Sequence, residues 1–360
     1  MSEIVLMKGN EVIAEAAIRA GCDGYFGYPI TPQSEIMETL MLREPWKETG
    51  MIVLQAESEI AAINMVYGGA SCGKKVMTSS SSPGISLKQE GISYLCGSQL
   101  PCLIVNVQRG GPGLGTIQPS QADYFQSVKG GGHGDYKLIV LAPNGVQEMN
   151  DFVHLGFTLA FRYRNPVMLL ADGVIGQMME KVQLSEYKKR WTDDEIEKIS
   201  GSWATTGKKN NRKQNVTSSL DLVALKQEKR NIQIQKKYRQ MEKKEVRFDT
   251  YRCDDKIDFL IVAYGSCARI CSKTVELLRE KEIKTGLLRP ITLFPFPIDE
   301  IKKYASQVKG ILTVEMSAAG QMVEDVKLAV NGRTRVDFYG RSGGVVPTPE
   351  EVYNYFIKNF

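Results

Sequence analysis

The chain has 360 residues, about the length of two domains. Hydrophobic residues make up 42% of it and charged residues 24%, which excludes a disordered or collagen-like protein. No apolar run approaches the roughly 20 residues of a membrane-spanning helix, and the N-terminus has no signal-peptide pattern. We therefore expect a soluble, cytoplasmic protein that does not bind membranes.

The first half of the chain alternates short apolar runs with amphipathic stretches. Strands are predicted at residues 24–27, 51–55, 76–78, 102–107, 138–142 and 167–171. Helices are predicted between several of these strands, at residues 33–41, 59–68 and 147–162. This alternation is typical of a parallel sheet covered by helices on both faces.

Residues 186–252 differ in composition from the rest. They contain 18 Lys or Arg and 10 Asp or Glu, whereas the net charge of the whole chain is only +5. In their second half, apolar residues recur at a spacing that suits an amphipathic helix, namely Leu222, Leu225, Ile232, Tyr238 and Met241. A basic segment of this kind suits nucleic acid or an acidic partner. A solvated connection with one packed helix face is the simpler interpretation, and we assign the segment as a linker.

The pattern of strands and helices resumes after the linker. Strands are predicted at residues 259–264, 285–288, 311–315 and 336–338, and helices at 268–281 and 321–330. The predicted fold class is therefore α/β, with two doubly wound parallel-sheet domains of unequal size. The predicted boundaries are 1–185 for the first domain, 186–252 for a basic, partly helical linker, and 253–360 for the second domain.

Cysteine and histidine content limits the metal chemistry of this chain. Seven cysteines and two histidines are present, and an odd number of cysteines without an export signal indicates reduced thiols. The spacing of Cys267 and Cys271 suits neither a zinc ribbon nor an iron–sulfur cluster. We expect no metal site and no cluster in this chain.

Glycine-, serine- and proline-rich segments follow the predicted strands, where the ligands of such sheets bind. We interpret GYPITPQSE, TSSSSPGISLKQEG and QRGGPGLGTIQPSQ as loops. Residues 68–75 (GGASCGKK) have the spacing of a phosphate loop, but they end in Lys75 instead of Ser or Thr and precede a strand. Residues 110–115 (GGPGLG) follow a strand, but they do not match the dinucleotide-binding pattern G-x-G-x-x-G. Neither segment predicts a nucleotide site.

Three polar residues lie at junctions between predicted strands, loops and helices. Thr31 is in the loop after the first strand, Glu59 follows the expected helix N-cap Ser58, and Arg109 directly follows the strand at 102–107. Singly, each has an ordinary explanation: a helix cap, an acid that favours the helix dipole, and a loop arginine in a salt bridge. Together they are candidates for a site.

The motifs around these residues resemble a known family. The segments YPITP, SEIAAINMVYGGASCG, MTSSSSPGISLKQEG and IVNVQRGGPGLG occur in the order found in the α subunit of thiamine-diphosphate-dependent 2-oxoacid:ferredoxin oxidoreductases. The resemblance is detailed over residues 5–182 and looser over 257–360, where LLRPITLFPFP takes part. MKGNEVIAEAAIRAGCDGYFGYPITPQSEI and GGGHGDYKLIVLAPNGVQEM are most similar to the 2-ketoisovalerate branch.

The resemblance implies both fold and site. The first domain would be of the pyrimidine-binding type and the second of the transketolase C-terminal type. Glu59 corresponds to the glutamate that bonds the thiamine pyrimidine at N1′, and serves there in catalysis and in cofactor binding. Thr31 and Arg109 correspond to residues that bind the 2-oxoacid. A guanidinium suits a planar carboxylate because it forms two parallel hydrogen bonds.

The same resemblance implies that the active site is shared between subunits. The sequence has no GDG…N-type motif of the kind that binds the diphosphate and Mg²⁺, since Ala171-Asp172-Gly173 has no matching Asn downstream. A β subunit would therefore supply that site. Iron–sulfur clusters would lie on a ferredoxin-like partner, and a γ subunit is a further candidate. The implied reaction is the CoA-dependent oxidative decarboxylation of a 2-oxoacid, with electrons passing to ferredoxin. We expect the isolated chain to be inactive.

The substrate and the class of enzyme leave alternatives open. Gly111, Pro112 and Leu114 add no charge beside Arg109, which favours branched-chain 2-ketoisovalerate over 2-oxoglutarate or pyruvate. A non-redox thiamine-dependent transferase subunit would need no low-potential acceptor. A nucleotide-binding scaffold would bind ATP or NAD as an isolated chain. A nucleic-acid interaction of the linker would be non-specific and sensitive to salt.

Overall fold

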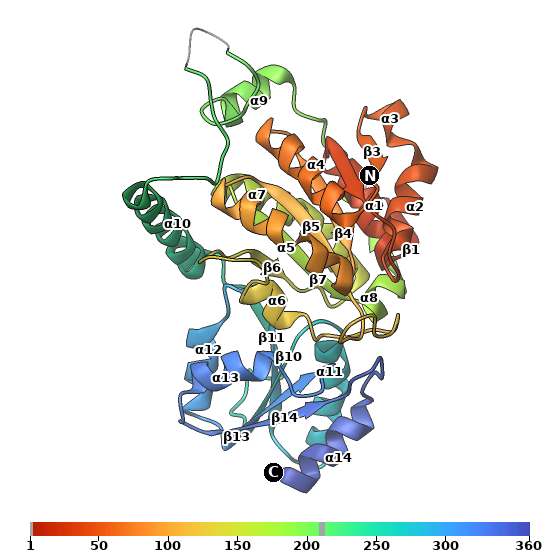
Figure 1. Cartoon of the computed structure of the whole chain (residues 1–360). Helices are drawn as coiled ribbons and strands as arrows, with labels where there is room; N and C mark the ends of the chain where they lie inside the picture. Colours follow the sequence, from red (N-terminus) through yellow and green to blue (C-terminus); the bar gives the residue numbers. More distant parts are fainter. Residues whose placement is uncertain (1–2, 209–212) are drawn as a thin grey trace.

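The computed structural model describes residues 3–208 and 213–360, which form two α/β domains stacked end to end (Figure 1). The first domain is built on a seven-stranded sheet with the order β12-β6-β7-β5-β4-β2-β3. Neighbouring strands are parallel, apart from β12, which is antiparallel to β6. The strands are β2 (Gly24–Gly27), β3 (Ile52–Gln55), β4 (Val76–Ser80), β5 (Cys102–Gln108), β6 (Ile139–Leu141), β7 (Pro166–Asp172) and β12 (Thr292–Phe294).

Alternation along the central strand β5 divides the core between the two faces of the sheet. Leu103 and Val105 pack on one face, and Cys102 and Ile104 pack on the other. The first face is covered by α1 (Gly9–Arg19), α2 (Ser34–Arg43) and α7 (Val146–Tyr163), and the second by α4 (Glu59–Ser71) and α5 (Ser82–Gly97). Because helices cover both faces, the inner strands are buried along their whole length and start as apolar runs, while polar residues gather at the carboxyl ends of β4, β5 and β7.

Smaller elements complete the first domain. A separate antiparallel pair joins β1 (Ile4–Lys8) to β8 (Met179–Gln183). Three short helices are α3 (Pro45–Glu48), α6 (Tyr124–Val128) and α8 (Gly173–Gln177).

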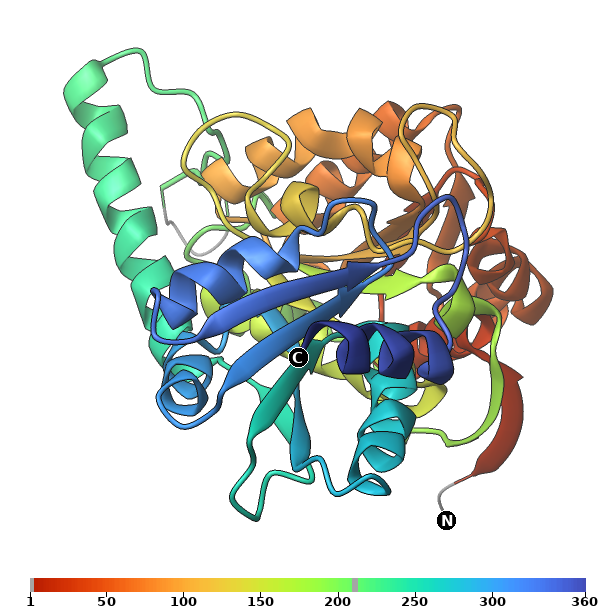
Figure 2. The ribbon, with the colours of Figure 1, turned by 90° about the horizontal axis from the view of Figure 1, so that it is seen from below.

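The second domain is a five-stranded sheet with the order β14-β13-β10-β11-β9. Its helices cover both faces, and one face packs toward the first domain, so that a single core cluster includes residues of both (Figure 2). The strands are β9 (Phe248–Tyr251), β10 (Phe259–Ala263), β11 (Thr285–Pro290), β13 (Gly310–Glu315) and β14 (Arg335–Gly340). The helices are α11 (Gly265–Arg279) and α14 (Pro349–Asn359) on the outer face, and α12 (Ile298–Ala305) and α13 (Met322–Val330) on the inner one.

The predicted fold class is confirmed, and each strand predicted from an apolar run is present. The strands that the sequence did not reveal are β1, β8, β9 and β12, all of which pair antiparallel. β8 and β9 are largely exposed and contain polar residues, and β12 has only three residues, whereas β1 has an apolar run at residues 4–7 from which no strand was predicted. In the described residues, no helix combines the length and the hydropathy that crossing a membrane requires.

The interpretation of TSSSSPGISLKQEG as a loop is wrong. Its serines end β4, and α5 begins at Ser82. Pro83 is compatible with this start because proline is favoured in the first turn of a helix. Gly84 and Gly91 masked the helical pattern, yet both face α4, where a Cβ atom would lie 2.7 Å from Glu59 Oε1 and 2.5 Å from Ile63 Cγ2 respectively.

The segment assigned as a linker contains α9 (Asp193–Ser200), α10 (Ala224–Lys244) and β9. The predicted helix is present in α10, but its packed face is only partly the predicted one. Tyr238 and Met241 are buried together with Ile234, whereas Leu225 and Ile232 are exposed. Figures 1 and 2 show α10 along the flank of the first domain, and β9 forms an edge of the second sheet.

Gln121, at the end of the Gly-rich loop, is one of the residues that join the two domains. Gln121 is fully buried, and its backbone N–H donates to Met316 O at 2.8 Å while its Oε1 accepts from Met316 N at 3.1 Å. Its Nε2 donates to Tyr264 O at 2.9 Å, and Tyr264 Oη donates back to Gln121 O at 3.0 Å. All the polar groups of Gln121 are therefore paired with the second domain.

We expect Gln121→Leu to lower the free energy of unfolding by about 1–3 kcal/mol, because it removes the bond to Tyr264 O and leaves the buried N–H of Met316 without its partner Gln121 Oε1. Chemical denaturation would measure this change. Gln118→Leu, an exposed position on the same loop, is the matched control and should change stability by about 0.5 kcal/mol or less. Equal stability of the two variants would contradict this role of Gln121.

Candidate functional site

The three predicted site residues lie at the carboxyl ends of strands β2, β3 and β5. Thr31 is in the loop between β2 and α2, Glu59 is the first residue of α4, and Arg109 directly follows β5. These strands run parallel in one sheet, with β4 between β5 and β2, so their carboxyl ends open on the same edge. The first turn of α5 packs between Glu59 and Arg109 and contacts both.

Glu59 is held by the start of its own helix and by α5. Ser58 is the N-cap as predicted, since its Oγ accepts from Ala61 N at 3.2 Å. Glu59 is 6% exposed, and its side chain lies so close to Gly84 that a Cβ there would be 2.7 Å from Oε1. Within the described residues, no hydrogen bond to the Glu59 carboxylate is present. The acid is therefore neither a solvated surface group nor a group paired within the chain.

Arg109 is buried, with 7% of its surface exposed, and is held by main-chain oxygens. Its Nη1 donates to Thr31 O and its Nη2 to Leu114 O, both at 3.1 Å. Nε is buried without a partner. Among the described ion pairs none involves Arg109, so the ordinary explanation of a loop salt bridge does not hold. A guanidinium has five N–H donors, so three remain for a ligand.

The backbone oxygen of Thr31 accepts a hydrogen bond from Arg109, whereas the side chain of Thr31 is exposed. It is not the cap of the following helix, because the N-cap of α2 is Gln33. Thr31 lines a cavity of about 530 Å³ between the domains, together with Ile117, Val174 and Val346. The structure thus brings the Arg109 guanidinium to the backbone of Thr31, and Thr31 but not Arg109 lines the cavity.

Ser82, which sequence reasoning missed, connects Arg109 to a buried acid. Arg109 N donates to Ser82 Oγ at 3.0 Å, and Ser82 Oγ donates to Asp123 Oδ2 at 2.6 Å. Asn106 Nδ2 also donates to Asp123 Oδ2, at 2.9 Å. Burial raises the pKa of Asp123, and the bonds from Ser82 and Asn106 act against that rise. The serine run after β4 was the only sequence signal of this support.

Several buried polar atoms near the first turn of α5 have no hydrogen-bond partner among the described residues. They are Ser80 Oγ, Ser81 Oγ, Asn106 Oδ1 and Arg109 Nε. Buried polar groups are ordinarily hydrogen-bonded. A ligand with polar edges fits such a place, and thiamine diphosphate has a pyrimidine ring of this kind. The residues present therefore fit the cofactor that the resemblance implied.

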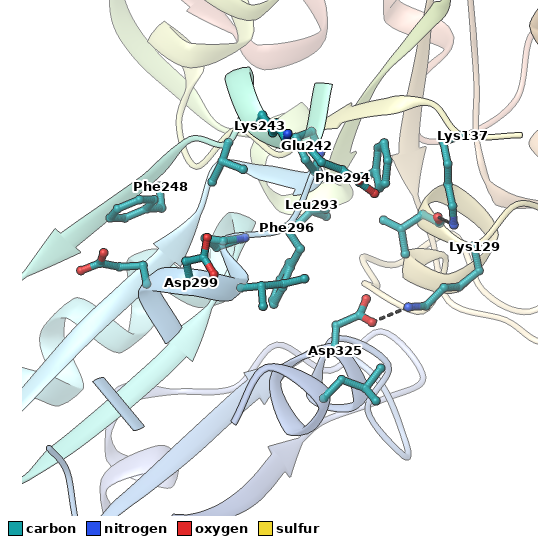
Figure 3. A pocket seen from close by; sticks show the side chains of 17 residues that line it. Lys129, Lys137, Glu242, Lys243, Phe248, Leu293, Phe294, Phe296, Asp299 and Asp325 are labelled. Carbon is teal, nitrogen blue, oxygen red and sulfur yellow. Dashed lines mark hydrogen bonds and ion pairs between the residues drawn. The ribbon is translucent and has the colours of Figure 1, made fainter. Parts of the chain in front are cut away.

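Other features of the chain lie away from this site. A cavity of about 750 Å³ between the domains is lined by Phe248, Phe294 and Phe296, and at its rim Lys129 pairs with Asp325 (Figure 3). It includes none of the three predicted site residues. In the described residues, no group of three or more His, Cys, Asp or Glu is placed to hold a metal ion.

Comparison with known proteins identifies the family. The profile described as pyruvate flavodoxin/ferredoxin oxidoreductase, thiamine diphosphate-binding, matches residues 15–244, and the pyruvate:ferredoxin oxidoreductase core domain II matches residues 257–352. The ketoisovalerate oxidoreductase subunit VorB of Methanothermobacter marburgensis is 50% identical over 94% of this chain and 93% of its own length. The 2-oxoglutarate synthase subunit KorA of Methanocaldococcus jannaschii is 35% identical, over 97% and 98% respectively.

A solved structure agrees with these relatives. The 2-oxoglutarate:ferredoxin oxidoreductase from Magnetococcus marinus, with 2-oxoglutarate, coenzyme A and succinyl-CoA bound, superposes with a TM-score of 0.85 and 25% identity. It covers 99% of this chain, which spans 65% of that chain's length. The fold and the relatives together define an oxidoreductase subunit that acts on 2-oxoacids. The chain belongs to the pyruvate flavodoxin/ferredoxin oxidoreductase family, which binds thiamine diphosphate, and the predicted resemblance is confirmed.

Lys88 on α5 is a second residue near the site that sequence reasoning missed. Because it is buried, we expect the free energy of unfolding to depend on pH. Burial lowers the pKa of Lys88 to about 8. An unfolded lysine has a pKa of about 10.4. Between about pH 8 and this value, Lys88 is mostly protonated in the unfolded chain and mostly neutral in the folded chain, so the unfolded chain binds more protons. The contribution of Lys88 to the free energy of unfolding therefore increases as the pH rises through this interval.

We expect the free energy of unfolding of the wild type, relative to Lys88→Met, to increase by about 2–3 kcal/mol between pH 7.5 and pH 10.5. Chemical denaturation of both proteins across this range measures the difference. Subtracting the variant removes the contributions of the other titrating groups. A difference that does not change with pH would contradict the burial of a charged Lys88.

Proposed function

We propose that the chain is the α-type subunit of a 2-oxoacid:ferredoxin oxidoreductase that acts on 2-ketoisovalerate. The reaction is the CoA-dependent oxidative decarboxylation of the 2-oxoacid to acyl-CoA and CO₂, with two electrons passing to ferredoxin. The observation that carries the proposal is the convergence of Glu59 and Arg109 on the first turn of α5. The identity of 50% to a VorB subunit over nearly the whole chain supports it.

Glu59 is the residue that would hold the cofactor in this chain. When bound, thiamine diphosphate supplies a carbon nucleophile for the carbonyl group of the substrate. The Glu59 carboxylate would bond the pyrimidine ring and hold or release a proton there, which requires a place where water is scarce. Its 6% exposure and its free carboxylate oxygens suit that task.

Arg109 and Thr31 would hold the substrate. The three N–H donors that Arg109 keeps free suit the planar carboxylate of a 2-oxoacid. The bonds to Thr31 O and Leu114 O fix the guanidinium before substrate arrives, which reduces the entropy that binding costs. The exposed Thr31 side chain has a hydroxyl that can orient the keto group at the mouth of the cavity.

The lining of the cavity beside Thr31 favours an apolar substrate side chain. Ile117, Pro119, Val174 and Val346 line it, and no Lys or Arg is among its described lining residues. A second carboxylate, as in 2-oxoglutarate, would need a cation there. The one charged residue in its described lining is Glu35, an anion already paired with Lys8 at 3.6 Å, so the described lining offers no cation to a second carboxylate.

Partner subunits would complete the active site. A β subunit would supply the diphosphate and Mg²⁺ site, and a ferredoxin-like subunit the iron–sulfur clusters. The relatives are themselves named as subunits. Around Glu59, the exposed apolar side chains of Ile60, Met65 and Leu87 on α4 and α5, and of Leu114 on the Gly-rich loop, offer a surface for the β subunit.

Glu59→Gln should lower turnover at least about 100-fold, because the amide cannot exchange a proton with the cofactor. The measurement is CoA- and 2-ketoisovalerate-dependent reduction of viologen under anaerobic conditions, with the chain co-expressed with its partner subunits. Glu57→Gln, a neighbouring acid outside helix α4, is the matched control and should retain wild-type turnover. A fully active Glu59→Gln enzyme would show that this carboxylate has no role with the cofactor.

Arg109→Lys should raise the KM for the 2-oxoacid about 10- to 100-fold, since lysine keeps the charge but loses the two-pronged hydrogen bonding. Steady-state kinetics in the same assay measures this. An unchanged KM would exclude Arg109 from substrate binding. Activity confined to 2-oxoglutarate or pyruvate would keep the reaction and reject the substrate, and activity without any low-potential acceptor would favour the non-redox transferase.

A further inference from the structure

Lys88 lies on the face of α5 that packs against Glu59. Gly84, Lys88 and Gly91 are spaced so that they share one side of the helix. Gly84 contacts the Glu59 side chain and Gly91 contacts Ile63, one turn further along α4. The two glycines bring the helices close together, and Lys88 is placed between these contacts.

The ammonium group of Lys88 is buried with little compensation. Lys88 is 0% exposed, and in the described part of the chain its Nζ forms one long hydrogen bond, 3.4 Å, to Glu59 O. An ammonium has three donors, and burying it without an ion pair is costly. A methionine would fill the same space without that cost, so packing alone does not account for a lysine here.

Glu59 is the charged group that acts on Lys88. Burial lowers the pKa of Lys88, and the Glu59 carboxylate is the one charged side chain that opposes the decrease. The neighbouring acid on α5, Glu90, points to the outer side and accepts a hydrogen bond from Tyr94. The electrostatic partner of Lys88 is therefore the proposed cofactor-binding carboxylate, which accepts no hydrogen bond from any described residue; Lys88 itself bonds the main-chain oxygen of Glu59.

We propose that Lys88 is a positioning residue that acts through Glu59: its buried positive charge stabilises the negative charge of the Glu59 carboxylate while that group bonds the pyrimidine ring of the cofactor. This inference rests on the proposed function of Glu59. The Lys88 ammonium donates to the main-chain oxygen of Glu59 and forms no direct ion pair with its carboxylate, so the charge acts through space, where a dry site screens it far less than water does. Lys88 itself does not contact the substrate-binding residues Thr31 and Arg109.

The test compares Lys88→Gln, which removes the charge, with Lys88→Arg, which keeps it, in the assembled enzyme. The first readout needs no turnover: near-ultraviolet circular dichroism of bound thiamine diphosphate reports the protonation state of its pyrimidine ring. We expect Lys88→Gln to change this spectrum and to lower kcat about 10- to 100-fold, with the KM for the 2-oxoacid within about twofold of wild type. Lys88→Arg should retain the spectrum and most of the turnover.

Lys75→Met is the matched control. Lys75 is another buried lysine, with its Nζ donating to Ala20 O at 3.1 Å and lying over the Trp191 ring, and its charge does not act on Glu59. This variant should leave both the spectrum and kcat unchanged. The isolated Lys88→Met chain should have a free energy of unfolding at pH 7 at least equal to that of the wild type. If Lys88 had a purely structural role, the substitution would lower it.

Equal spectra and equal kcat values for Lys88→Gln and Lys88→Arg would overturn the proposal. Failure of the proposed function gives a different result. In that case the wild-type complex oxidises no 2-oxoacid and Glu59→Gln leaves the cofactor spectrum unchanged. If Glu59→Gln changes the spectrum and Lys88→Gln does not, the role of Glu59 stands and that of Lys88 is rejected.

Discussion

The arrangement of the site depends on how closely the first turn of α5 approaches the carboxyl ends of β4 and β5. Ser82 in this turn accepts from the backbone of Arg109 and donates to Asp123, and Gly84 leaves the space that the Glu59 side chain occupies. The same turn therefore fixes the group proposed for the substrate and the group proposed for the cofactor. A larger residue than glycine at position 84 would displace the side chains of Ser80 and Glu59, since its Cβ would lie 2.0 Å from Ser80 Oγ and 2.7 Å from Glu59 Oε1.

The second domain holds in place the loop that follows Arg109. Gln121 ends the loop that begins at Arg109, and its pairing with Met316 and Tyr264 ties that loop to the second sheet. A further tie joins Asp172 at the end of β7 to Ser266 at the start of α11, at 2.7 Å. The loop that carries Leu114 is thus held at both ends, which limits how far the Arg109 guanidinium can move.

Most of the fold could be predicted because inner parallel strands contain unbroken apolar runs, such as residues 102–105 of β5 and 166–171 of β7. Thr31, Glu59 and Arg109 were identifiable because each directly follows or lies near such a strand. Ser82 and Lys88 were not, since two glycines and a proline disguised α5 and the burial of a lysine depends on tertiary packing. Antiparallel edge strands such as β12 also escaped prediction, because three residues give too short a pattern.

Strand β12 has a consequence for the independence of the two domains. It comes from the second half of the chain, yet it pairs with Val140 and Leu141 of β6 and so closes the edge of the first sheet. A truncated first domain would expose β6 as an open strand edge, which is a template for aggregation. The first domain therefore depends on a strand from the second half of the chain. A gene fusion or an evolutionary exchange that replaced the second domain would have to supply a matching edge strand as well.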